Sequence, residues 1–378
     1  MISEISIVSG IFPPDVGGPA TFTEAFSWYE SKGGTKVNVI STHANRNIQF
    51  FQNRNLHIRL INRNTNLIIR TLRLILEIKR KSKTANITIA NGAFIETLIA
   101  LTFRFRGKPY LAKIPGDIVW ERACSNFYTN KSVFEFQQQP LNIKYKVLRF
   151  LFTLSLKKSE RIIVPAPYLR DLCISWGVPE NKLFEIGNTV DTELFRPSSK
   201  INKIYDVITV SRLVPVKQID ALIQACSRMN LSLAIVGDGP LRKELEELAQ
   251  RTDSRVTFLG QIAQNDLPKI YSQAKVFVLN SKIEATSYSL LEARSSGLIS
   301  IANCGTGSED VIRHLEDGIL CGEKTGFELE GALEYVFSEK FDWEKGCNLA
   351  RSLTINEYDR KLNFNRINEL LLEVAQGR

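Results

Sequence analysis

The chain has 378 residues, of which 44% are hydrophobic, 9% aromatic and 24% charged. This composition supports a substantial buried core and excludes a disordered chain. Because domains usually contain roughly 100–200 residues, the length predicts about two domains.

The six cysteines are scattered along the chain, at positions 124, 173, 226, 304, 321 and 347. They form no Cys-x-x-Cys pair and have no histidine at zinc-binding spacing, which argues against a disulfide framework or a metal site and indicates a reducing compartment. The first ten residues lack the basic and apolar regions of a signal peptide, and no apolar run reaches the roughly 18 residues of a membrane-spanning helix. The expected location is cytoplasmic, in solution or on the inner face of a membrane.

Positive charge is concentrated in the first half of the chain. Residues 1–198 contain 27 Lys and Arg against 15 Asp and Glu, a net charge of +12, whereas residues 199–378 carry −3. Two stretches with helical spacing combine this charge with Leu, Ile and Phe, namely Asn66–Lys83 and Leu141–Lys158. A basic amphipathic helix can bind anionic lipid, but a core-facing helix with a solvated face has the same pattern. No nucleic-acid-binding motif accompanies the charge, so we expect no nucleic acid partner.

Short apolar strands alternate with helical patterns in both halves of the chain. In the first half the predicted strands are Ile5–Val8, Val37–Ile40, Ile87–Ala90, Tyr110–Ile114 and Arg161–Val164. In the second half they are Asp206–Val210, Ser232–Val236, Val256–Leu259, Val276–Leu279 and Ile299–Ala302, separated by helical stretches near 216–228, 239–250, 264–274, 288–296 and 326–338. Apolar strands that alternate with helices indicate parallel sheets covered on both faces.

A stretch rich in Pro and Ser, Phe195–Tyr205, separates the two series of strands and is the best candidate linker. We therefore predict an α/β protein of two Rossmann-like domains that face each other across a cleft. The first domain is predicted to span residues 1–198 and the second residues 199–355. A last helical stretch, Ile355–Ala375, has no strand after it and could pack on either domain.

Ligands of open α/β sheets bind at the carboxyl ends of the strands, so polar and glycine-rich segments there are candidate sites. The first such segment is Ser9–Phe22, where Gly17 and Gly18 follow a strand and precede a helix. Glycines at this place let a phosphate approach backbone N–H groups. A tight turn that needs positive φ would use the same residues.

Two further segments follow strands of the second half. In Val210–Asp220, Arg212 and Lys217 could converge on a diphosphate, because Arg offers a fork of donors and Lys a point charge. Ordinary surface charge is the alternative. The segment Ile235–Ala249 has part of a dinucleotide-binding glycine pattern but carries Arg242 in place of the third glycine, which argues against NAD.

The fourth segment, Asn280–Gly297, contains Glu284 and Glu292. A carboxylate pair can serve acid/base catalysis, but Glu284 falls in the loop after a strand whereas Glu292 lies within the following helix. Carboxylates accept hydrogen bonds from sugar and ribose hydroxyls, and the N–H groups of residues 287–290 at the helix start could hold a phosphate. A sugar nucleotide is the ligand that uses all of these groups.

The order of these segments resembles that of the family-four retaining glycosyltransferases of the GT-B fold, group 1 type. The matching segments run along nearly the whole chain and read FPPDVGGPATF (12–22), NTVDTELFRP (188–197), VSRLVPVKQIDALIQA (210–225), VGDGPL (236–241), VTFLG (256–260), NSKIEATSYSLLEARSSG (280–297) and GTGSEDVIRHLEDGIL (305–320). The Arg and Lys pair followed by the two-glutamate motif is the most specific part of the resemblance.

The resemblance implies a catalytic role for three of these residues. Arg212 and Lys217 would neutralise the donor diphosphate and stabilise the leaving group. Glu284 would contact the donor sugar, and Glu292 would accept hydrogen bonds from the ribose hydroxyls of the donor.

The same resemblance implies further donor contacts and a domain arrangement. Gly17 and Gly18 would lie near the diphosphate or the acceptor. The remaining donor-binding residues that we expect are Gly237, Ser287, Tyr288, Ser289 and Leu290. No metal or other cofactor is implied. Residues 356–378 would pack back on the first domain, which would hold the acceptor.

The chain departs from the family pattern at two places. Family members often carry a His after the strand that corresponds to Tyr110–Ile114, where this chain has Pro-Gly-Asp ending at Asp117. We expect Asp117 to take the sugar-facing position as a catalytic residue, with Trp120 and Glu121 on the acceptor side. The sequence EATSYS replaces the more usual Glu-Gly-Phe-Gly, which predicts a changed preference for the donor sugar.

The predicted function is metal-independent transfer of a sugar from a nucleotide-diphosphate donor to a hydroxyl of a lipid-linked or polysaccharide acceptor, with retention of configuration. Such a reaction would serve polysaccharide or lipopolysaccharide biosynthesis. A non-catalytic GT-B scaffold that binds a partner or a membrane, and a related sugar-nucleotide epimerase, are the alternatives. The basic first domain favours an anionic or membrane-embedded acceptor. Binding to anionic vesicles would then depend on the cations of one basic segment, which are Arg70, Arg73, Lys79, Arg80 and Lys81.

Overall fold

The computed structural model describes residues 2–43, 54–102, 109–198 and 201–377. The chain forms two compact units. Unit 1 comprises Met1–Ile186 and Phe364–Arg378, and unit 2 comprises Gly187–Asn363. Each unit contains one sheet with helices on both faces.

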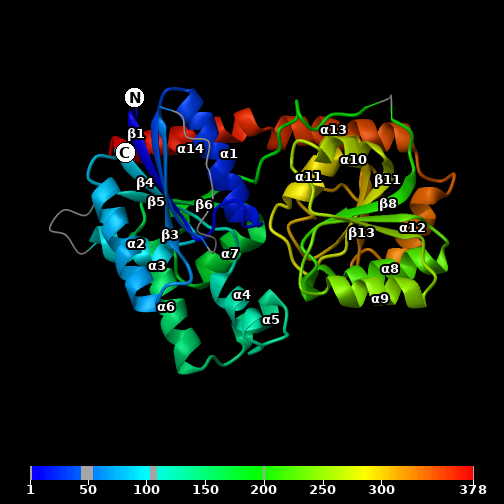
Figure 1. Ribbon diagram of the computed structural model, residues 1–378, viewed down its shortest axis with the longest axis horizontal. Helices are drawn as coiled ribbons and strands as arrows, with labels where there is room; N and C mark the ends of the chain where they lie inside the picture. Colours follow the sequence, from blue (N-terminus) through cyan, green and yellow to red (C-terminus); the bar gives the residue numbers. More distant parts are fainter. Residues whose placement is uncertain (1, 44–53, 103–108, 199–200, 378) are drawn as a thin grey trace. The chain divides into compact units, whose positions relative to one another are not determined.

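Unit 1 is built on a parallel sheet that contains seven strands among the residues described, in the order β3-β2-β1-β4-β5-β6-β7 (Figure 1). The strands are β1 (Glu4–Ser9), β2 (Lys36–His43), β3 (Leu56–Asn62), β4 (Ile87–Asn91), β5 (Tyr110–Lys113), β6 (Arg161–Val164) and β7 (Leu183–Glu185). The helices are α1 (Gly18–Lys32), α2 (Leu67–Lys81), α3 (Phe94–Thr102), α4 (Ile118–Ser125), α5 (Val133–Gln138), α6 (Ile143–Lys158), α7 (Pro167–Ser175), the 3-10 turn η1 (Glu180–Lys182) and the greater part of α14 (Arg360–Ala375).

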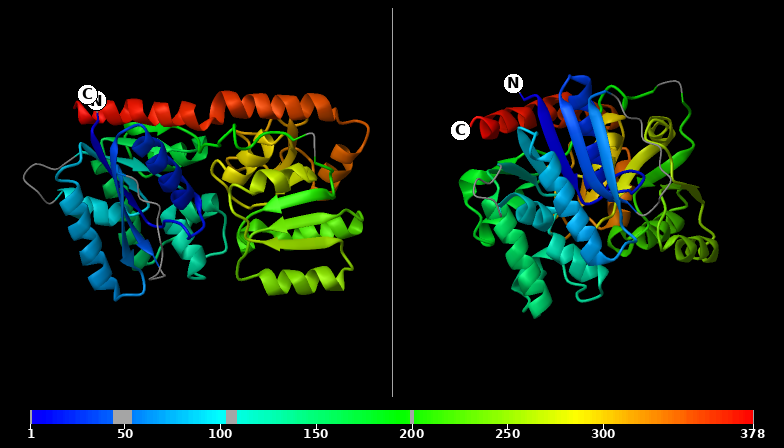
Figure 2. Two further views of the ribbon diagram at one scale, coloured as in Figure 1. Left: turned by 45° about the horizontal axis from the view of Figure 1, so that its top comes forward. Right: turned by 60° about the vertical axis from the view of Figure 1, so that its left-hand side comes forward.

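Helices cover both faces of the unit 1 sheet. The β1-α1-β2 and β3-α2-β4 connections run in opposite directions along the strand order, so right-handed crossovers place α1 and α2 on opposite faces. The ring of Phe364 in α14 packs edge-on against Phe22 and Phe26 of α1. On the other face α2 packs beside α3, and α3 packs beside α6 (Figures 1 and 2).

Unit 2 has a parallel sheet with the order β10-β9-β8-β11-β12-β13 in the part of the chain that the structure describes. Its strands are β8 (Tyr205–Val210), β9 (Leu233–Val236), β10 (Val256–Gly260), β11 (Ala274–Leu279), β12 (Ile299–Asn303) and β13 (Gly318–Cys321). The helices are the 3-10 turn η2 (Pro215–Lys217), α8 (Ile219–Arg228), α9 (Arg242–Arg251), α10 (Leu267–Ser272), α11 (Tyr288–Ser295), α12 (Leu329–Phe337) and α13 (Trp343–Tyr358).

Alternate residues of the unit 2 strands enter two separate hydrophobic cores, because successive side chains of a strand point to opposite faces. Val207 and Val276 join a core with residues of α8, α9 and α12. Ile208 and Phe277, one position further along the same strands, join a core with residues of α10 and α11. Both faces of the sheet are therefore buried, as the continuous apolar strands predict.

The predicted α/β class with two Rossmann-like parallel sheets is confirmed, and each strand expected from the sequence is present within three residues of its expected bounds. The prediction that the two domains face each other across a cleft stays a prediction. Three strands were not predicted from the sequence, namely β3, β7 and β13, and they lie at the edges of the sheets. An edge strand need not be a continuous apolar run: β3 alternates buried and exposed residues, and β7 has only 3 residues.

The structure divides the chain at Ile186 and Gly187, before the boundary predicted at residues 198 and 199. Residues 187–198, which lie between the two boundaries, belong to unit 2. Val190 donates its backbone N–H to the carbonyl of Tyr358 over 3.0 Å, and Phe195 is fully buried in a unit 2 core. Part of the predicted linker Phe195–Tyr205 is thus core, and residues 199 and 200 of it lie outside the described residues.

The predicted single helix Ile355–Ala375 is divided at Asp359 into the end of α13 and α14. Asp359 adopts extended backbone with ψ 138° and forms a β-bridge with Val190. The carboxylate of Asp359 also accepts a hydrogen bond of 2.6 Å from the Thr192 hydroxyl. Pairing with the 187–198 segment therefore breaks the helix, and from Phe364 onward the chain belongs to unit 1.

Within the described part of the chain, every helix is too short or too polar to cross a bilayer.

Candidate functional site

Three loops meet at the carboxyl ends of the unit 2 strands, where ligands of such sheets bind. They follow β8 (residues 211–218), β9 (237–241) and β11 (280–287). The N–H of Leu213 donates to the carbonyl of Asp238 over 3.0 Å, and the N–H of Lys282 donates to the carbonyl of Val216 over 2.9 Å. These backbone bonds fasten all three loops to one another.

The structure brings together Lys217 and Glu284, which are 67 residues apart in the sequence. The Lys217 Nζ forms an ion pair with Glu284 Oε1, and the two side chains are only 16% and 15% exposed. Lys217 ends the turn η2, and the next residue, Gln218, adopts a left-handed conformation with φ 47° before α8 begins. The side chain of Asn280 donates to the carbonyl of Gln218 over 3.1 Å, which ties this turn to the loop that carries Glu284.

Arg212 lies on the same loop as Lys217, and its side chain is exposed. No carboxylate within the described ranges forms an ion pair with Arg212. The loop therefore presents one cation that is paired and one that is open to an anionic ligand.

Gly237 and Gly239 are required by a close approach of backbones. A Cβ atom on Gly237 would lie 1.9 Å from the carbonyl oxygen of Ser211, and one on Gly239 would lie 2.4 Å from that of Leu213. Gly237 also has φ +125°, which side chains rarely tolerate. The glycines that superficially fit a dinucleotide-binding pattern thus allow the loop of residues 211–218, which carries Arg212, to pack closely against them. A contact of Gly237 with the donor stays a prediction.

Glu292 lies in α11 and is almost completely buried, with 6% of its surface exposed. The Tyr271 hydroxyl donates to its Oε2 over 3.1 Å, and the Gln264 amide donates to its Oε1 over 3.4 Å. Burial raises the pKa of Glu292 to about 7, although these hydrogen bonds favour the charged form and act in the opposite direction. Neither partner is predicted from the sequence, because Gln264 and Tyr271 fall in a helical stretch whose pattern is typical of ordinary core packing.

The N-terminus of α11 follows the Glu284 loop directly. Ser287 is the N-cap residue, and its hydroxyl lies 3.2 Å from that of Ser289. The N–H groups of Tyr288, Ser289 and Leu290 precede the first intrahelical bond, which runs from Leu291 to Ser287 over 3.1 Å. These groups and the helix dipole favour an anion at this end.

Gly17 and Gly18 lie in unit 1 and form the start of α1 after β1, as the glycine pattern predicts. Gly17 is the N-cap residue, and its carbonyl accepts hydrogen bonds of 3.0 Å from Ala20 and 3.1 Å from Thr21. A Cβ atom on Gly17 would lie 2.9 Å from the side chain of Ile11. Their contact with a donor or an acceptor stays a prediction.

Asp117 has a structural role in this arrangement. Its side chain is fully buried and caps α4, with Oδ1 accepting from the N–H groups of Val119 at 2.9 Å and Trp120 at 3.2 Å. Oδ2 accepts from Arg149 at 2.6 Å and from Gln137 at 3.1 Å. Four protein donors thus occupy the carboxylate, which favours a structural role, and the expected sugar-facing role of Asp117 stays a prediction.

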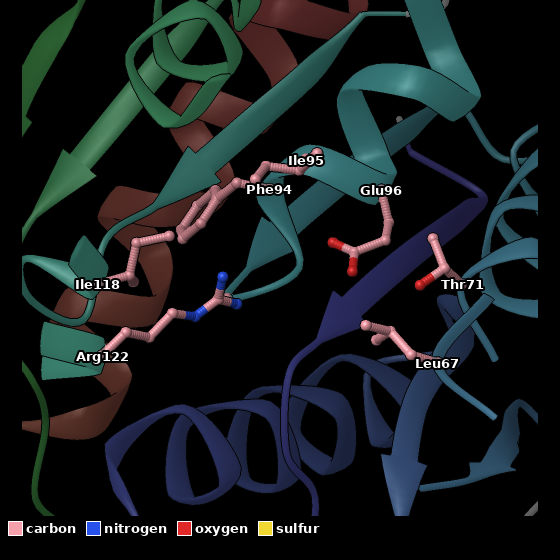
Figure 3. A pocket seen from close by; sticks show the side chains of 8 residues that line it. Leu67, Thr71, Phe94, Ile95, Glu96, Ile118 and Arg122 are labelled. Atoms are coloured by element: carbon pink, nitrogen blue, oxygen red, sulfur yellow. The ribbon is translucent and has the colours of Figure 1, made fainter. Parts of the chain in front are cut away.

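Unit 1 contains a pocket of about 210 Å³ between α2, α3 and α4. Its lining residues are Leu67, Thr71, Gly92, Phe94, Ile95, Glu96, Ile118 and Arg122. The guanidinium of Arg122 and the carboxylate of Glu96 point toward one another into this pocket (Figure 3). Helix α4 thus contributes Ile118 and Arg122 to the lining of the pocket. Trp120, which we expected on the acceptor side, instead donates its indole N–H to the carbonyl of Lys131 over 3.0 Å.

In the ranges that the structure describes, no cluster of three or more His, Cys, Asp or Glu side chains could hold a metal ion. A reaction without metal stays a prediction.

Residues 191–358 match a family model described as glycosyl transferases group 1. The chain is 27% identical over 213 residues to a sulfoquinovosyl transferase of Arabidopsis thaliana, and the match covers 53% of this chain and 39% of that protein. It is 30% identical over 177 residues to the GDP-mannose-dependent alpha-(1-6)-phosphatidylinositol monomannoside mannosyltransferase of Mycobacterium tuberculosis, and this match covers 40% of this chain and 46% of that protein. The chain thus spans less than half the length of these curated relatives.

Two solved structures share the fold over nearly the whole chain. HepE of Anabaena in complex with UDP and glucose has a TM-score of 0.76 and 17% identity, and the match covers 98% of this chain and 100% of that one. Sucrose-phosphate synthase of Thermosynechococcus elongatus has a TM-score of 0.80 and 17% identity, with 100% of both chains covered. These likenesses confirm the predicted GT-B fold.

Proposed function

We propose that this chain, whose residues 191–358 match the group 1 glycosyl transferases, transfers a sugar from a nucleoside diphosphate. The receiving group is a hydroxyl of a lipid-linked or polysaccharide acceptor. The protein acts in the cytoplasm, at the inner face of a membrane, in polysaccharide or lipopolysaccharide assembly.

The observation that carries this proposal is the Lys217–Glu284 ion pair, together with the exposed Arg212 on the same loop as Lys217. In sugar transfer the bond between the anomeric carbon and the diphosphate breaks, and the leaving oxygen gains negative charge. Two cations at that oxygen stabilise the charge as it develops. Glu284 holds Lys217 in place before the donor arrives and can accept hydrogen bonds from the sugar hydroxyls afterwards.

The rest of the donor is bound by α11. Phosphate oxygens accept hydrogen bonds from the N–H groups at the start of the helix, and the ribose hydroxyls donate to the carboxylate of Glu292. Ribose would then replace the weak bond from Gln264, which is 3.4 Å long in the free protein. In HepE of Anabaena a related fold is seen in complex with UDP-glucose, which supports a sugar nucleotide as the donor.

We propose that configuration is retained and that no metal takes part. Retention rests on the resemblance of the Arg, Lys and two-glutamate pattern to retaining enzymes. The acceptor oxygen then bonds to the anomeric carbon, and the proton of its hydroxyl passes to the departing diphosphate oxygen. Arg212 and Lys217 supply the positive charge that a divalent cation supplies in other reactions of this kind.

The acceptor is proposed to bind at the unit 1 pocket. Arg122 suits a phosphate group of a lipid-linked saccharide, because guanidinium forms strong hydrogen bonds to phosphate. Glu96 can accept hydrogen bonds from sugar hydroxyls, and Leu67 and Ile118 provide apolar walls.

Release of nucleoside diphosphate from UDP-, GDP-, ADP- and TDP-sugars, with and without lipid-linked or polysaccharide acceptors, tests the proposal. We expect one of the donors to be consumed. Its sugar should be recovered either attached to an acceptor or, after transfer to water, as the free sugar. Lys217→Ala is expected to slow this reaction at least about 100-fold, because it removes a cation from the leaving group. The matched control is Lys243→Ala on α9, whose side chain is 89% exposed and which should react like the parent protein.

Binding of a donor without any turnover would favour the non-catalytic scaffold instead. Conversion of the donor to an isomeric sugar nucleotide would favour the epimerase. A Lys217→Ala protein that keeps the parent rate would contradict the role assigned to the ion pair.

A further inference from the structure

Tyr271 of α10 contacts α11 at the turn that is proposed to bind the donor. Its side chain is fully buried, and its ring packs edge-on against the rings of Phe195 and Phe277. The hydroxyl lies 3.1 Å from Oε2 of Glu292 and 3.2 Å from the carbonyl oxygen of Ser289. Because the ring contacts fix the side chain, the hydroxyl has a defined place beside both oxygens.

The phenol of Tyr271 has one proton for these two oxygens. A charged carboxylate is the stronger acceptor, so the proton goes to Glu292 when this residue is ionised. When Glu292 is protonated, the phenol can donate to the carbonyl of Ser289 instead. The hydroxyl therefore has a partner in both states, and it stabilises the ionised state of Glu292 more than the neutral state.

The two carboxylate oxygens of Glu292 have different surroundings. Oε2 faces the buried Tyr271, whereas Oε1 accepts a hydrogen bond from the amide of Gln264 over 3.4 Å. Gln264 is half-buried and lies in the loop between β10 and α10, and a bond of this length is weak for an N–H donor. Oε1 is therefore the oxygen that a ligand can reach, and its present bond is the one that a ligand can replace.

We propose that Tyr271 is a positioning residue for donor binding, which holds Oε2 of Glu292 so that Oε1 accepts a hydrogen bond from a ribose hydroxyl. The inference rests on the proposed function, in which Glu292 binds the ribose of the donor. Without the phenol, the buried carboxylate would lose its bond on Oε2 and would take up a proton more readily. A protonated carboxyl group is a weaker acceptor, so the affinity for ribose would fall.

The charged and titratable groups around Glu292 make this role depend on pH. Burial raises the pKa of Glu292 to about 7, whereas the hydrogen bonds from Tyr271 and Gln264 act in the opposite direction. Arg360, at the start of α14, also lowers the pKa of Glu292 through its positive charge. Burial raises the pKa values of the Tyr271 and Tyr288 phenols, so both stay neutral near pH 7. The affinity for ribose should thus increase as pH rises through about 7, and removal of the Tyr271 hydroxyl should move this increase to higher pH.

The test measures the binding of UDP, GDP, ADP and TDP to the full chain by calorimetry. The nucleotide that binds most tightly is then compared with its counterpart that lacks the ribose hydroxyls, and the ratio of the two dissociation constants measures ribose recognition. For the parent chain this ratio should rise at least about tenfold between pH 5.5 and pH 8.5, with a midpoint near pH 7. Tyr271→Phe should move the midpoint up by about one pH unit and lower the ratio at pH 7 at least about threefold.

Two further proteins separate positioning from packing. The control Tyr335→Phe removes the same hydroxyl group from α12, on the opposite face of the unit 2 sheet, and should keep the ratio and the midpoint of the parent. Replacement of Tyr271 by meta-fluorotyrosine keeps the hydroxyl and makes it a stronger donor, so the midpoint should move to lower pH. This protein carries the test even if Tyr271→Phe does not fold.

The outcomes distinguish this inference from the proposed function on which it rests. A ratio and a midpoint in Tyr271→Phe that equal those of the parent would overturn the inference while the proposed function stands. Midpoints that move in the same direction in Tyr271→Phe and in the meta-fluorotyrosine protein would do so as well. A parent chain that binds none of the four nucleotides would overturn the proposed function and this inference with it.

Discussion

Lys217 and Glu284 neutralise each other in the free protein, and this has consequences for donor binding. A diphosphate must compete with Glu284 for the ammonium group, whereas the exposed Arg212 needs no such exchange. Arg212 is therefore suited to the first contact with the donor and Lys217 to the contact that strengthens as charge develops on the leaving oxygen. We therefore expect the two cations to differ in role, although they share one loop.

Glu292 makes the stability of the protein depend on pH. Burial raises its pKa from 4.5 to about 7, so between these values the folded protein holds a proton that the unfolded chain releases. The stability contributed by this proton is present below pH 4.5 and is lost as pH rises through 7. Glu292→Gln stays neutral at every pH, so its free energy of unfolding relative to that of the parent protein should rise by about 2–3 kcal/mol between pH 5 and pH 8.

Urea unfolding at the two pH values measures this gain. Glu244 is an exposed carboxylate on α9, and Glu244→Gln is the control. Its free energy of unfolding should differ from that of the parent protein by the same amount at pH 5 and at pH 8. A Glu292→Gln effect that is the same at pH 5 and pH 8 would show that Glu292 does not carry a raised pKa.

At the scale of elements, α4 depends on Asp117. This carboxylate caps the helix and also forms the ion pair with Arg149 of α6, whose guanidinium lies 4.2 Å from the ring centre of Trp176. Asp117→Ala uncaps α4 and leaves a largely buried Arg149 without its carboxylate. Such a loss costs about 3–5 kcal/mol for the buried pair.

Chemical unfolding of Asp117→Ala should therefore show a free energy of unfolding lower by about 3–5 kcal/mol. The control is Asp342→Ala, which removes the exposed N-cap residue of α13. It should lower the free energy of unfolding by about 1 kcal/mol. The folded fraction of Asp117→Ala should turn over at the parent rate. A stable Asp117→Ala protein with lost turnover would restore the sugar-facing role that the sequence suggested.

The sequence predicts central strands better than edges. Strands such as β1 and β11 are buried on both faces and read as continuous apolar runs, whereas β3 alternates and β7 is too short to stand out. The break at Asp359 could not be foreseen, because it depends on pairing with Val190, which is far away in the sequence.

In the candidate site, too, some features could be predicted from the sequence and others could not. Spacing and residue type identified Lys217 and Glu284, which the fold brings into contact. They also suggested Asp117, because a carboxylate after a strand looks the same whether it faces a ligand or caps a helix. The contacts with Arg149 and Gln137 favour the helix cap, and the sugar-facing role of Asp117 stays a prediction.

At the scale of the whole molecule, the two halves of the chain carry opposite charge. Residues 1–198 have a net charge of +12 and residues 199–378 have −3. The general field of the second half therefore does not attract an anionic donor, and we expect binding of a diphosphate to depend on the local cations Arg212 and Lys217. The basic excess of the first half instead suits an anionic acceptor or a bilayer.

The most direct test of the central claim compares the binding of a nucleoside diphosphate with that of its monophosphate by isothermal titration calorimetry. Both ligands carry the nucleobase whose diphosphate raises the melting temperature of the protein most. The parent protein is expected to prefer the diphosphate at least about 30-fold, or about 2 kcal/mol. Arg212→Ala/Lys217→Ala should reduce this preference to less than about threefold, whereas Lys243→Ala/Lys345→Ala should keep it. A preference for the diphosphate that survives in Arg212→Ala/Lys217→Ala would contradict the account.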